Sequence, residues 1–167
     1  FIATLFYALD YFLHTAPNVL ITPISETLNS SSNPSLVGAT MQIYFPIYAL
    51  CQLPAGYLLD RLGLKLPLAL AAALVGTGLW ITTWATFPAL YLGRALTAIG
   101  SSFAFLGALK TAATWLPKNR TGLATGLTNS VGTILGGAIL GLPILNLLIK
   151  QQNSSWQEAL NIMAGAT

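Results

Sequence analysis

Three polar side chains recur at intervals of four residues near the start of the chain: Asp10, His14 and Asn18. Residues four apart lie on one face of an α-helix, so a carboxylate, an imidazole and an amide would share one stripe. The surrounding run is apolar, and inside a membrane an ionised side chain costs roughly 2.5–3.5 kcal/mol. We therefore expect this stripe to line a polar cavity, with Asn18 as a candidate contact for a solute. The alternative is that Asp10 lies nearer the membrane surface.

Arg94 is the second charge that the sequence places in an apolar run, residues 90–96. An arginine keeps its charge, so away from water it needs an acidic partner, backbone carbonyl groups or an anionic ligand. Asp10 is the only carboxylate within the expected spans. At 1.5 Å per residue, however, Arg94 lies about 9 Å and Asp10 about 20 Å from the outer helix ends. His14 or Asn18 is therefore expected closer to Arg94. Arg94 could alternatively extend its guanidinium to the membrane interface.

Further polar residues fall on two other apolar runs. Tyr44, Tyr48 and Gln52 are spaced by four. Tyr44 suits the aromatic belt of a membrane interface, whereas Tyr48 and Gln52 are expected deeper, in contact with a solute. Asn129 has two readings: it contacts the solute, or it hydrogen-bonds to a neighbouring helix.

Chemistry that breaks or makes bonds finds no support in the sequence. We find no Ser/His/Asp set, no zinc-ligand spacing and no phosphate-binding loop, and the single Cys51 allows neither an internal disulfide nor a metal cluster. We expect no enzyme activity, no metal and no cofactor.

The elements that position these residues are long apolar helices. The chain is 54% hydrophobic and 7% charged, with a mean hydropathy of +0.70. Soluble domains carry roughly 25% charged residues, so this chain cannot cover a surface that faces water. Runs of about 20 apolar residues can cross a bilayer, and they are too long for barrel strands. The runs predict helices over residues 1–24, 36–59, 66–86, 89–116 and 121–149, with a sixth starting near Trp156.

Glycine and proline are frequent within these spans, as at Gly76, Gly78, Gly136 and Gly137. Small residues allow membrane helices to pack closely. They could equally form hinges, and the sequence alone does not separate the two roles.

The links between the spans differ in charge. The second link holds Arg61 and Lys65, and the fourth holds Lys118 and Arg120, preceded by Lys110. Short loops rich in lysine and arginine stay in the cytoplasm, so both links are expected inside. Because these bases flank the membrane, the net charge of +3 gives no reason to expect a nucleic-acid partner.

The second link has a pattern of its own, Gly56-x-x-x-Asp60-Arg61-x-Gly63-x-Lys65. This pattern resembles the signature between helices 2 and 3 of the major facilitator superfamily, although Leu64 occupies a position that is usually basic. Leu90-x-x-x-Arg94 with Gly100 is similar to the superfamily's helix 4 signature, although Thr97 and Ala98 replace a glutamine and a glycine. Residues 115–126 resemble its helix 4–5 junction. The glycine pattern of drug antiporters is absent from residues 121–149.

The resemblance implies an all-α membrane protein, with residues 1–167 as the N-terminal six-helix half of a twelve-helix fold built from inverted three-helix repeats. The C-terminal half is absent from this chain and would be its partner, together with lipid. In such proteins the aspartate of the first signature holds the inward gate closed, which implies a gating role for Gly56, Asp60, Arg61, Gly63 and Lys65. These bases could instead fix topology alone.

The helix 4 arginine is associated in this family with proton coupling or anion binding. Carried to Arg94, the resemblance implies a secondary transporter of a small polar or anionic solute, with Asp10 or His14 as the protonatable partner. We expect proton-coupled symport across a bacterial inner membrane. The alternatives are a multidrug-type efflux antiporter and a non-transporting membrane receptor.

Overall fold

The computed structural model describes residues 7–8, 10–12, 24–25, 34–84, 86–115, 118–136, 161 and 164–165. The longer helices in these ranges are α3 (Pro34–Gln42), α4 (Tyr44–Leu62), α5 (Lys65–Thr82), α6 (Phe87–Trp115) and α7 (Lys118–Thr133). None of the described residues forms a strand. The expectation of an all-α fold is confirmed.

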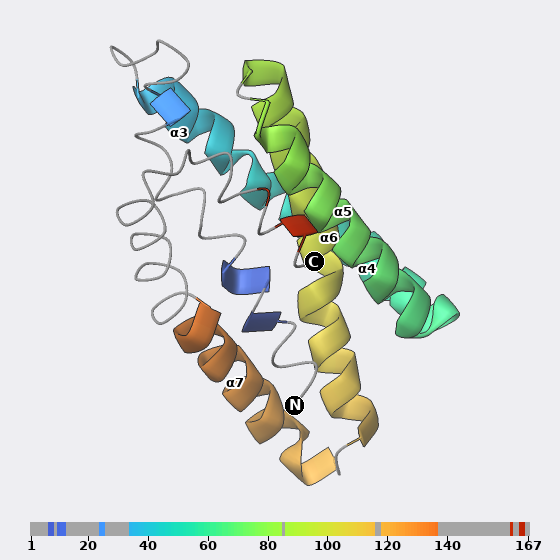
Figure 1. Ribbon diagram of the computed structural model, residues 1–167. Coiled ribbons are helices and arrows are strands. Elements are labelled where there is room, and N and C mark those ends of the chain that lie inside the picture. Colours follow the sequence, from blue (N-terminus) through green and yellow to red (C-terminus); the bar gives the residue numbers. More distant parts are fainter. Residues whose placement is uncertain are drawn as a thin grey trace.

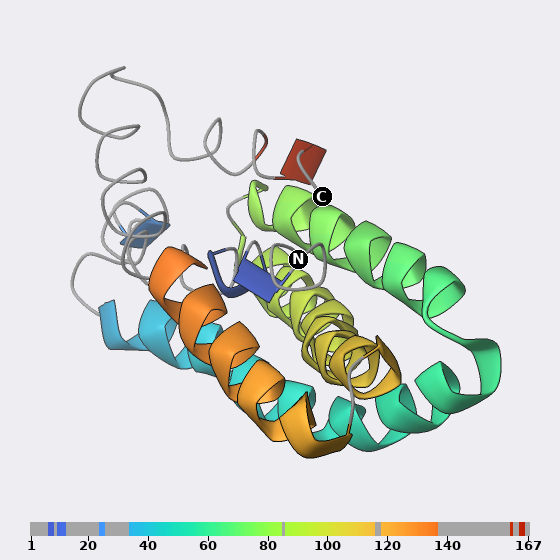
Figure 2. The ribbon, with the colours of Figure 1, turned by 90° about the horizontal axis from the view of Figure 1, so that it is seen from below.

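Helix α6 lies at the centre of the described helices. It packs most extensively against α5, then against α4, and more lightly against α7 and α3. Figure 2 shows α6 near the middle, with α4, α5 and α7 arranged around it. Side chains on α6 can therefore reach most of the other helices.

Helices α3 and α4 together form the second predicted span. One turn residue, Ile43, separates them, and three residues later comes Pro46. Proline has no backbone N–H, so the carbonyl of Gln42 loses the donor that a continuous helix would supply. The break therefore has a local cause in the sequence.

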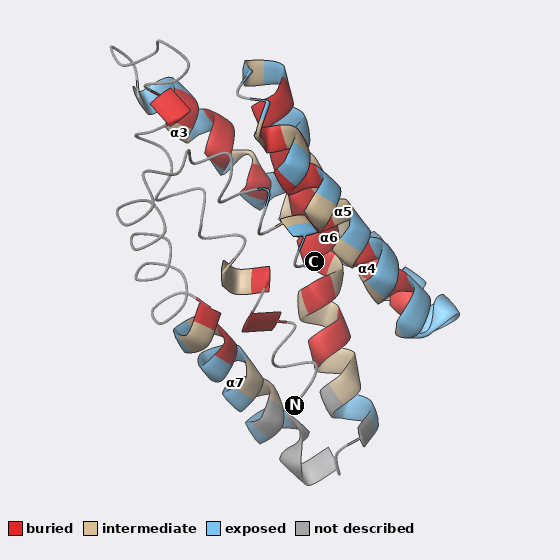
Figure 3. Ribbon diagram, viewed as in Figure 1, coloured by how far each residue is buried: buried red, intermediate tan, exposed pale blue. Residues whose placement is uncertain are grey.

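Three apolar segments are long enough to cross a membrane: Ser35–Leu62, Lys65–Thr82 and Phe87–Thr111. The 18 residues of α5 extend about 27 Å, close to the thickness of a hydrocarbon core. Trp80 and Trp84 pack edge to face beside one end of α5, and both are exposed, whereas Lys65 opens the other end. Figure 3 shows buried and exposed faces along these helices (Figure 1 gives their labels).

Helices α5 and α6 touch through their backbones. A Cβ atom added to Gly78 would lie 2.7 Å from the carbonyl oxygen of Gly93, and one added to Gly100 would lie 2.7 Å from that of Ala71. Real Cβ atoms do not approach a carbonyl oxygen so closely, so larger residues would force the helices apart. Of the two roles left open for glycine, close packing is the one that Gly78 fulfils.

The predicted helix boundaries agree with the structure to within a few residues where both can be compared. Helices α5 and α6 match the predicted spans 66–86 and 89–116, and α7 begins at Lys118, three residues before the predicted start at Thr121. The rest of the predicted fifth helix, beyond residue 136, lies outside the described residues, as do most of the first helix and the start of the sixth near Trp156.

Candidate functional site: a buried polar cluster and a charged helix end

Asp10 is buried, with 8% of its surface exposed, and it belongs to a short helical segment, residues 10–12. Its Oδ1 accepts a hydrogen bond of 2.6 Å from the hydroxyl of Ser101 in α6. Ser101 is completely buried. Asp10 therefore lies inside the helix bundle and not at its edge.

Arg94 is 2% exposed and lies seven residues before Ser101 in α6. Its guanidinium carbon stands 4.8 Å above the ring of Tyr44, an arrangement in which the ring face attracts the positive charge. Its Nε donates a hydrogen bond of 3.4 Å to the carbonyl oxygen of Met41. Its Nη1 is buried and has no hydrogen-bond partner in the described part of the chain. The burial excludes a guanidinium that reaches out to the membrane interface.

The two buried charges do not pair with each other. Among the described residues, the ion pair that the structure contains joins Asp60 and Lys110, and neither Asp10 nor Arg94 takes part in one. Tyr44 is instead the common neighbour of both charges, and its hydroxyl also lies beside Ser101. His14 and Asn18, which we expected closer to Arg94, lie outside the described residues.

Tyr44 departs from its expected place. It is 3% exposed and its ring stacks on that of Tyr48, with centroids 5.6 Å apart and planes inclined by 14°. The assignment of Tyr44 to an interface belt is therefore wrong, because the α4 face that carries it packs against α6. Tyr48 and Gln52 continue the same stripe, are half-buried, and interact with each other.

Asn129 of α7 joins a different contact. Its side-chain oxygen accepts a hydrogen bond of 2.8 Å from the hydroxyl of Tyr7. The pocket beside this bond has a volume of about 10 Å³, enough for one water molecule at most. The bond favours the reading in which Asn129 links two segments. Its role as a solute contact remains a prediction.

The charged hairpin between α4 and α5 forms as the sequence predicts. Gly63 ends α4 with a φ angle of 77°, a conformation that residues with a side chain rarely adopt. Lys65 then opens α5. Arg61 lies over the ring of Tyr57 at 4.7 Å, and both residues are exposed.

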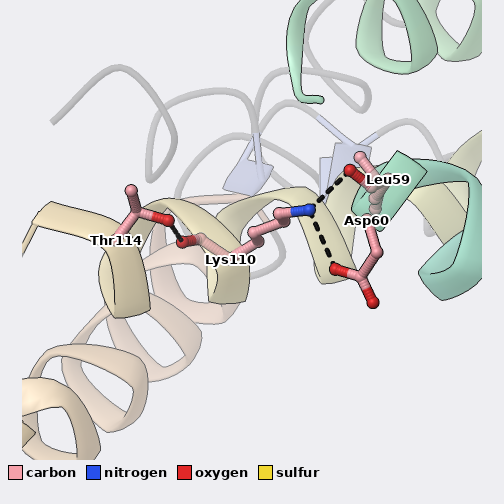
Figure 4. Close-up of polar contacts among 4 residues, drawn as sticks. All are labelled: Leu59, Asp60, Lys110 and Thr114. Carbon is pink, nitrogen blue, oxygen red and sulfur yellow. Dashed lines mark hydrogen bonds and ion pairs between the residues drawn. The ribbon is translucent and has the colours of Figure 1, made fainter. Parts of the chain in front are cut away.

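Asp60 pairs with a base from another helix. The Nζ atom of Lys110 in α6 lies 2.8 Å from Oδ1 of Asp60 and also donates a hydrogen bond to the carbonyl oxygen of Leu59 (Figure 4). The side chain of Asp60 is 77% exposed and that of Lys110 is 29% exposed. Beside this pair, α4, α6 and α7 enclose an open cleft of about 420 Å³, lined by Gly56, Leu59, Asp60, Leu106, Leu109, Lys110, Ala113 and Thr125. Gly56 thus lines the same cleft as the ion pair.

The comparisons with known proteins agree with this architecture. A family model described as Major Facilitator Superfamily matches residues 1–167. The chain belongs to the major facilitator superfamily. One similar protein is the "Uncharacterized transporter YybO" of Bacillus subtilis (strain 168), which is 31% identical over 147 residues. The match covers 84% of this chain and 32% of that protein, so the chain spans about a third of its relative's length. No solved structure matches the chain significantly.

Membership of the major facilitator superfamily confirms the resemblance drawn from Gly56–Lys65 and Leu90–Gly100. Together with the three apolar helices, it makes this an integral membrane protein. The sequence predicted that Asp10 and Arg94 lie in the interior, as the structure shows. It gave no prediction for Ser101, for the pairing of Lys110 with Asp60 or for the burial of Tyr44. The sequence did hold one signal for Ser101: it follows Arg94 by seven residues, two helical turns, and so shares a face with it. The described residues contain no group of three or more potential metal ligands.

Proposed function

We propose that this protein is a secondary transporter that imports a small polar or anionic solute together with protons, by alternating access. The observation that carries the proposal is the separation of two buried charges, Asp10 and Arg94, which share Tyr44 as a neighbour without forming an ion pair. Buried charges are normally paired, and those inside membrane proteins mark ion and substrate pathways.

The free Nη1 of Arg94 supports an anionic solute. A guanidinium presents donors in a planar fork that fits a carboxylate or a phosphate. Arg94 uses Nε on a carbonyl oxygen and leaves Nη1 without a partner among the described residues. In this proposal a solute anion binds at that end of the guanidinium, with Tyr48, Gln52, Asn18 and Asn129 as further solute contacts.

Asp10 supports proton coupling, with His14 as the second candidate. Ser101 donates to the Asp10 carboxylate, and no described cation neutralises it. Protonation would remove a negative charge from the cavity that the solute anion enters. Proton binding and solute binding would then strengthen each other by linkage.

The ends of the helices support an orientation. Asp60, Arg61, Lys65 and Lys110 gather at one end of the bundle, where Asp60 and Lys110 are in contact, whereas Trp80 and Trp84 lie beside the other end of α5. Basic residues favour the cytoplasmic side. We place the charged end in the cytoplasm, residues 1–167 as the N-terminal half of the transporter, and the protein in a bacterial inner membrane.

The decisive experiment is Asp10→Asn in the full-length protein, reconstituted into liposomes. Thermal stabilisation by a panel of amino acids, organic acids, sugars, phosphates and cationic drugs, at about pH 5.5 and about pH 7.5, first identifies the solute class. We expect Asp10→Asn to abolish uptake driven by a pH gradient and to retain counterflow exchange of the solute. Uptake with an unchanged pH dependence would refute proton coupling through Asp10, and stabilisation by cationic drugs alone would favour efflux.

A further inference from the structure

Ser101 behaves differently from the other hydroxyl side chains of α6. This helix contains five serine and threonine residues, and four of them donate to a carbonyl oxygen of their own helix: Thr97, Ser102, Thr111 and Thr114. Such bonds to the preceding turn are the usual arrangement for a hydroxyl inside a helix. Ser101 instead donates across the bundle to Asp10, 91 residues away in the sequence.

The hydroxyl of Ser101 lies between the Asp10 carboxylate and the Tyr44 hydroxyl and can form hydrogen bonds with both. It has one hydrogen and two lone pairs, and it lies beside both the Asp10 carboxylate and the Tyr44 hydroxyl. An ionised Asp10 can only accept, so Ser101 must donate to it. A protonated Asp10 can itself donate, which leaves the hydrogen of Ser101 available for another acceptor.

Tyr44 connects this hydroxyl to the anion site. The guanidinium of Arg94 lies 4.8 Å above the Tyr44 ring, so a change in the bonding of the Tyr44 hydroxyl bears on the group that supports Arg94. Within the part of the chain that the structure describes, Asp10 and Arg94 form no ion pair with each other. The contacts Asp10–Ser101–Tyr44–Arg94 therefore form one described route between the two charges, beside the proximity of Tyr44 itself to Asp10.

We propose that Ser101 is a positioning residue that couples the protonation state of Asp10 to anion binding at Arg94 through Tyr44. The inference rests on the function proposed above. Among the described residues, the other titratable groups around Asp10 are Tyr7 and Tyr11 near it in the chain and Tyr44 and Tyr48 in α4. Helix α3 contains no acidic or basic residue, and those of α7 lie in its first turn. His14, on the predicted Asp10 stripe, is outside the described residues.

The neighbouring Ser102 supplies a matched control. It is also completely buried, but its hydroxyl donates to the carbonyl oxygen of Ile99 at 2.7 Å. Ser102→Ala removes the same chemical group one position away without touching Asp10. Ser101→Cys keeps the shape of serine with a weak donor, and Ser101→Thr keeps the hydroxyl. These variants keep the test valid if Ser101→Ala does not fold.

The first measurement is the infrared absorption of protonated carboxyl groups in the full-length protein, followed against pH and assigned by subtracting Asp10→Asn. A hydrogen bond donated to a carboxylate favours its ionised form. We expect the Asp10 band in Ser101→Ala and Ser101→Cys to reach half its height at a pH about one unit higher, a tenfold gain in proton affinity. Ser101→Thr and Ser102→Ala should match the wild type.

The second measurement is binding of succinate and of inorganic phosphate at several pH values, read from tryptophan fluorescence. We expect Ser101→Ala and Ser101→Cys to retain anion binding but to lose most of its dependence on pH. Identical behaviour of Ser101→Ala and Ser102→Ala in both measurements would overturn the coupling role of Ser101 and leave the proposed proton coupling through Asp10 untouched. A wild-type protein without a pH-dependent Asp10 band would overturn both this inference and proton coupling through Asp10.

Discussion

Asp10 and Arg94 are 8% and 2% exposed, whereas the side chains of Asp60 and Lys110 are 77% and 29% exposed. Each region holds an acid and a base, but the exposed pair is in direct contact at 2.8 Å and the buried charges are kept apart. The exposed pair joins α4 to α6 and needs no ligand. The buried charges meet only neutral hydroxyl, aromatic and carbonyl groups in the described structure. In the proposed function, Asp10 takes up a proton and Arg94 binds an anion.

Burial also sets how much each region contributes to stability. An exposed ion pair typically contributes about 0–1 kcal/mol, because water screens the charges and two long side chains lose freedom. Removing one member of a buried polar arrangement leaves the other unsatisfied, at a cost of about 1–3 kcal/mol or more for charged groups. The comparison therefore predicts large effects of substitutions in the middle of α6 and small effects on stability at its charged end.

The largest effect on anion affinity should come from replacing the buried Arg94, with the exposed Arg61 as the matched control. Both Arg94 and Arg61 stand over a tyrosine ring, at 4.8 Å and 4.7 Å. We expect Arg94→Met to lower anion affinity by about ten- to hundredfold, in line with about 1.5–3 kcal/mol for hydrogen bonds to charged groups. Arg61→Met should leave affinity unchanged. Titration calorimetry measures both, and equal losses would contradict the distinction between the two regions.

An intermediate effect is expected at Tyr44, whose ring and hydroxyl can be removed separately. Tyr44→Leu removes the ring below Arg94, and cation–π contacts contribute about 0.5–2 kcal/mol, so affinity should fall by about twofold to thirtyfold. Tyr44→Phe keeps the ring and should preserve affinity while weakening its pH dependence. If the two variants bind anions equally well, the ring does not support Arg94.

The smallest effect on stability should come from Asp60→Asn and Lys110→Met, singly and combined. We expect each to lower the free energy of unfolding by less than about 1 kcal/mol, with a coupling energy in the same range, because Asp60 is largely exposed. We expect these substitutions to change the rate of exchange between inward- and outward-open states. Fluorescence labels in the cleft beside the pair would measure this rate. A loss of folded protein would mean that the pair is structural.

How far the sequence predicted this arrangement depends on the range of the contacts. The hairpin at Gly63, the apolar spans and the burial of Arg94 follow from local residue types, and all were predicted. The pairing of Asp60 with Lys110 crosses 50 residues, and that of Ser101 with Asp10 crosses 91. The seven-residue spacing from Arg94 puts Ser101, and not Ser102, on the same face of α6 as Arg94. Periodicity gives the face of a helix but not the neighbour that this face meets, so the contact with Asp10 could not be predicted.

Tyr44 illustrates the same limit. Its spacing with Tyr48 and Gln52 correctly indicated a shared face, but an aromatic residue near a helix end suits an interface as well as a core. Its burial follows from the packing of α3 and α4 against α6. The same holds for the α5–α6 contact at Gly78 and Gly93: the sequence shows that small residues are present, but not which helices they bring together.

That glycine contact also bears on the order in which the protein assembles. Helices α5 and α6 are consecutive in the chain and touch backbone to backbone, so their contacts close only a short loop. Contacts between near neighbours in sequence form sooner than distant ones. We expect residues 65–115 to enter the bilayer as a helical hairpin that pairs early and serves as a template. The Asp10–Ser101 bond would form later on this template, so the proposed proton site would be complete only after α5 and α6 have paired.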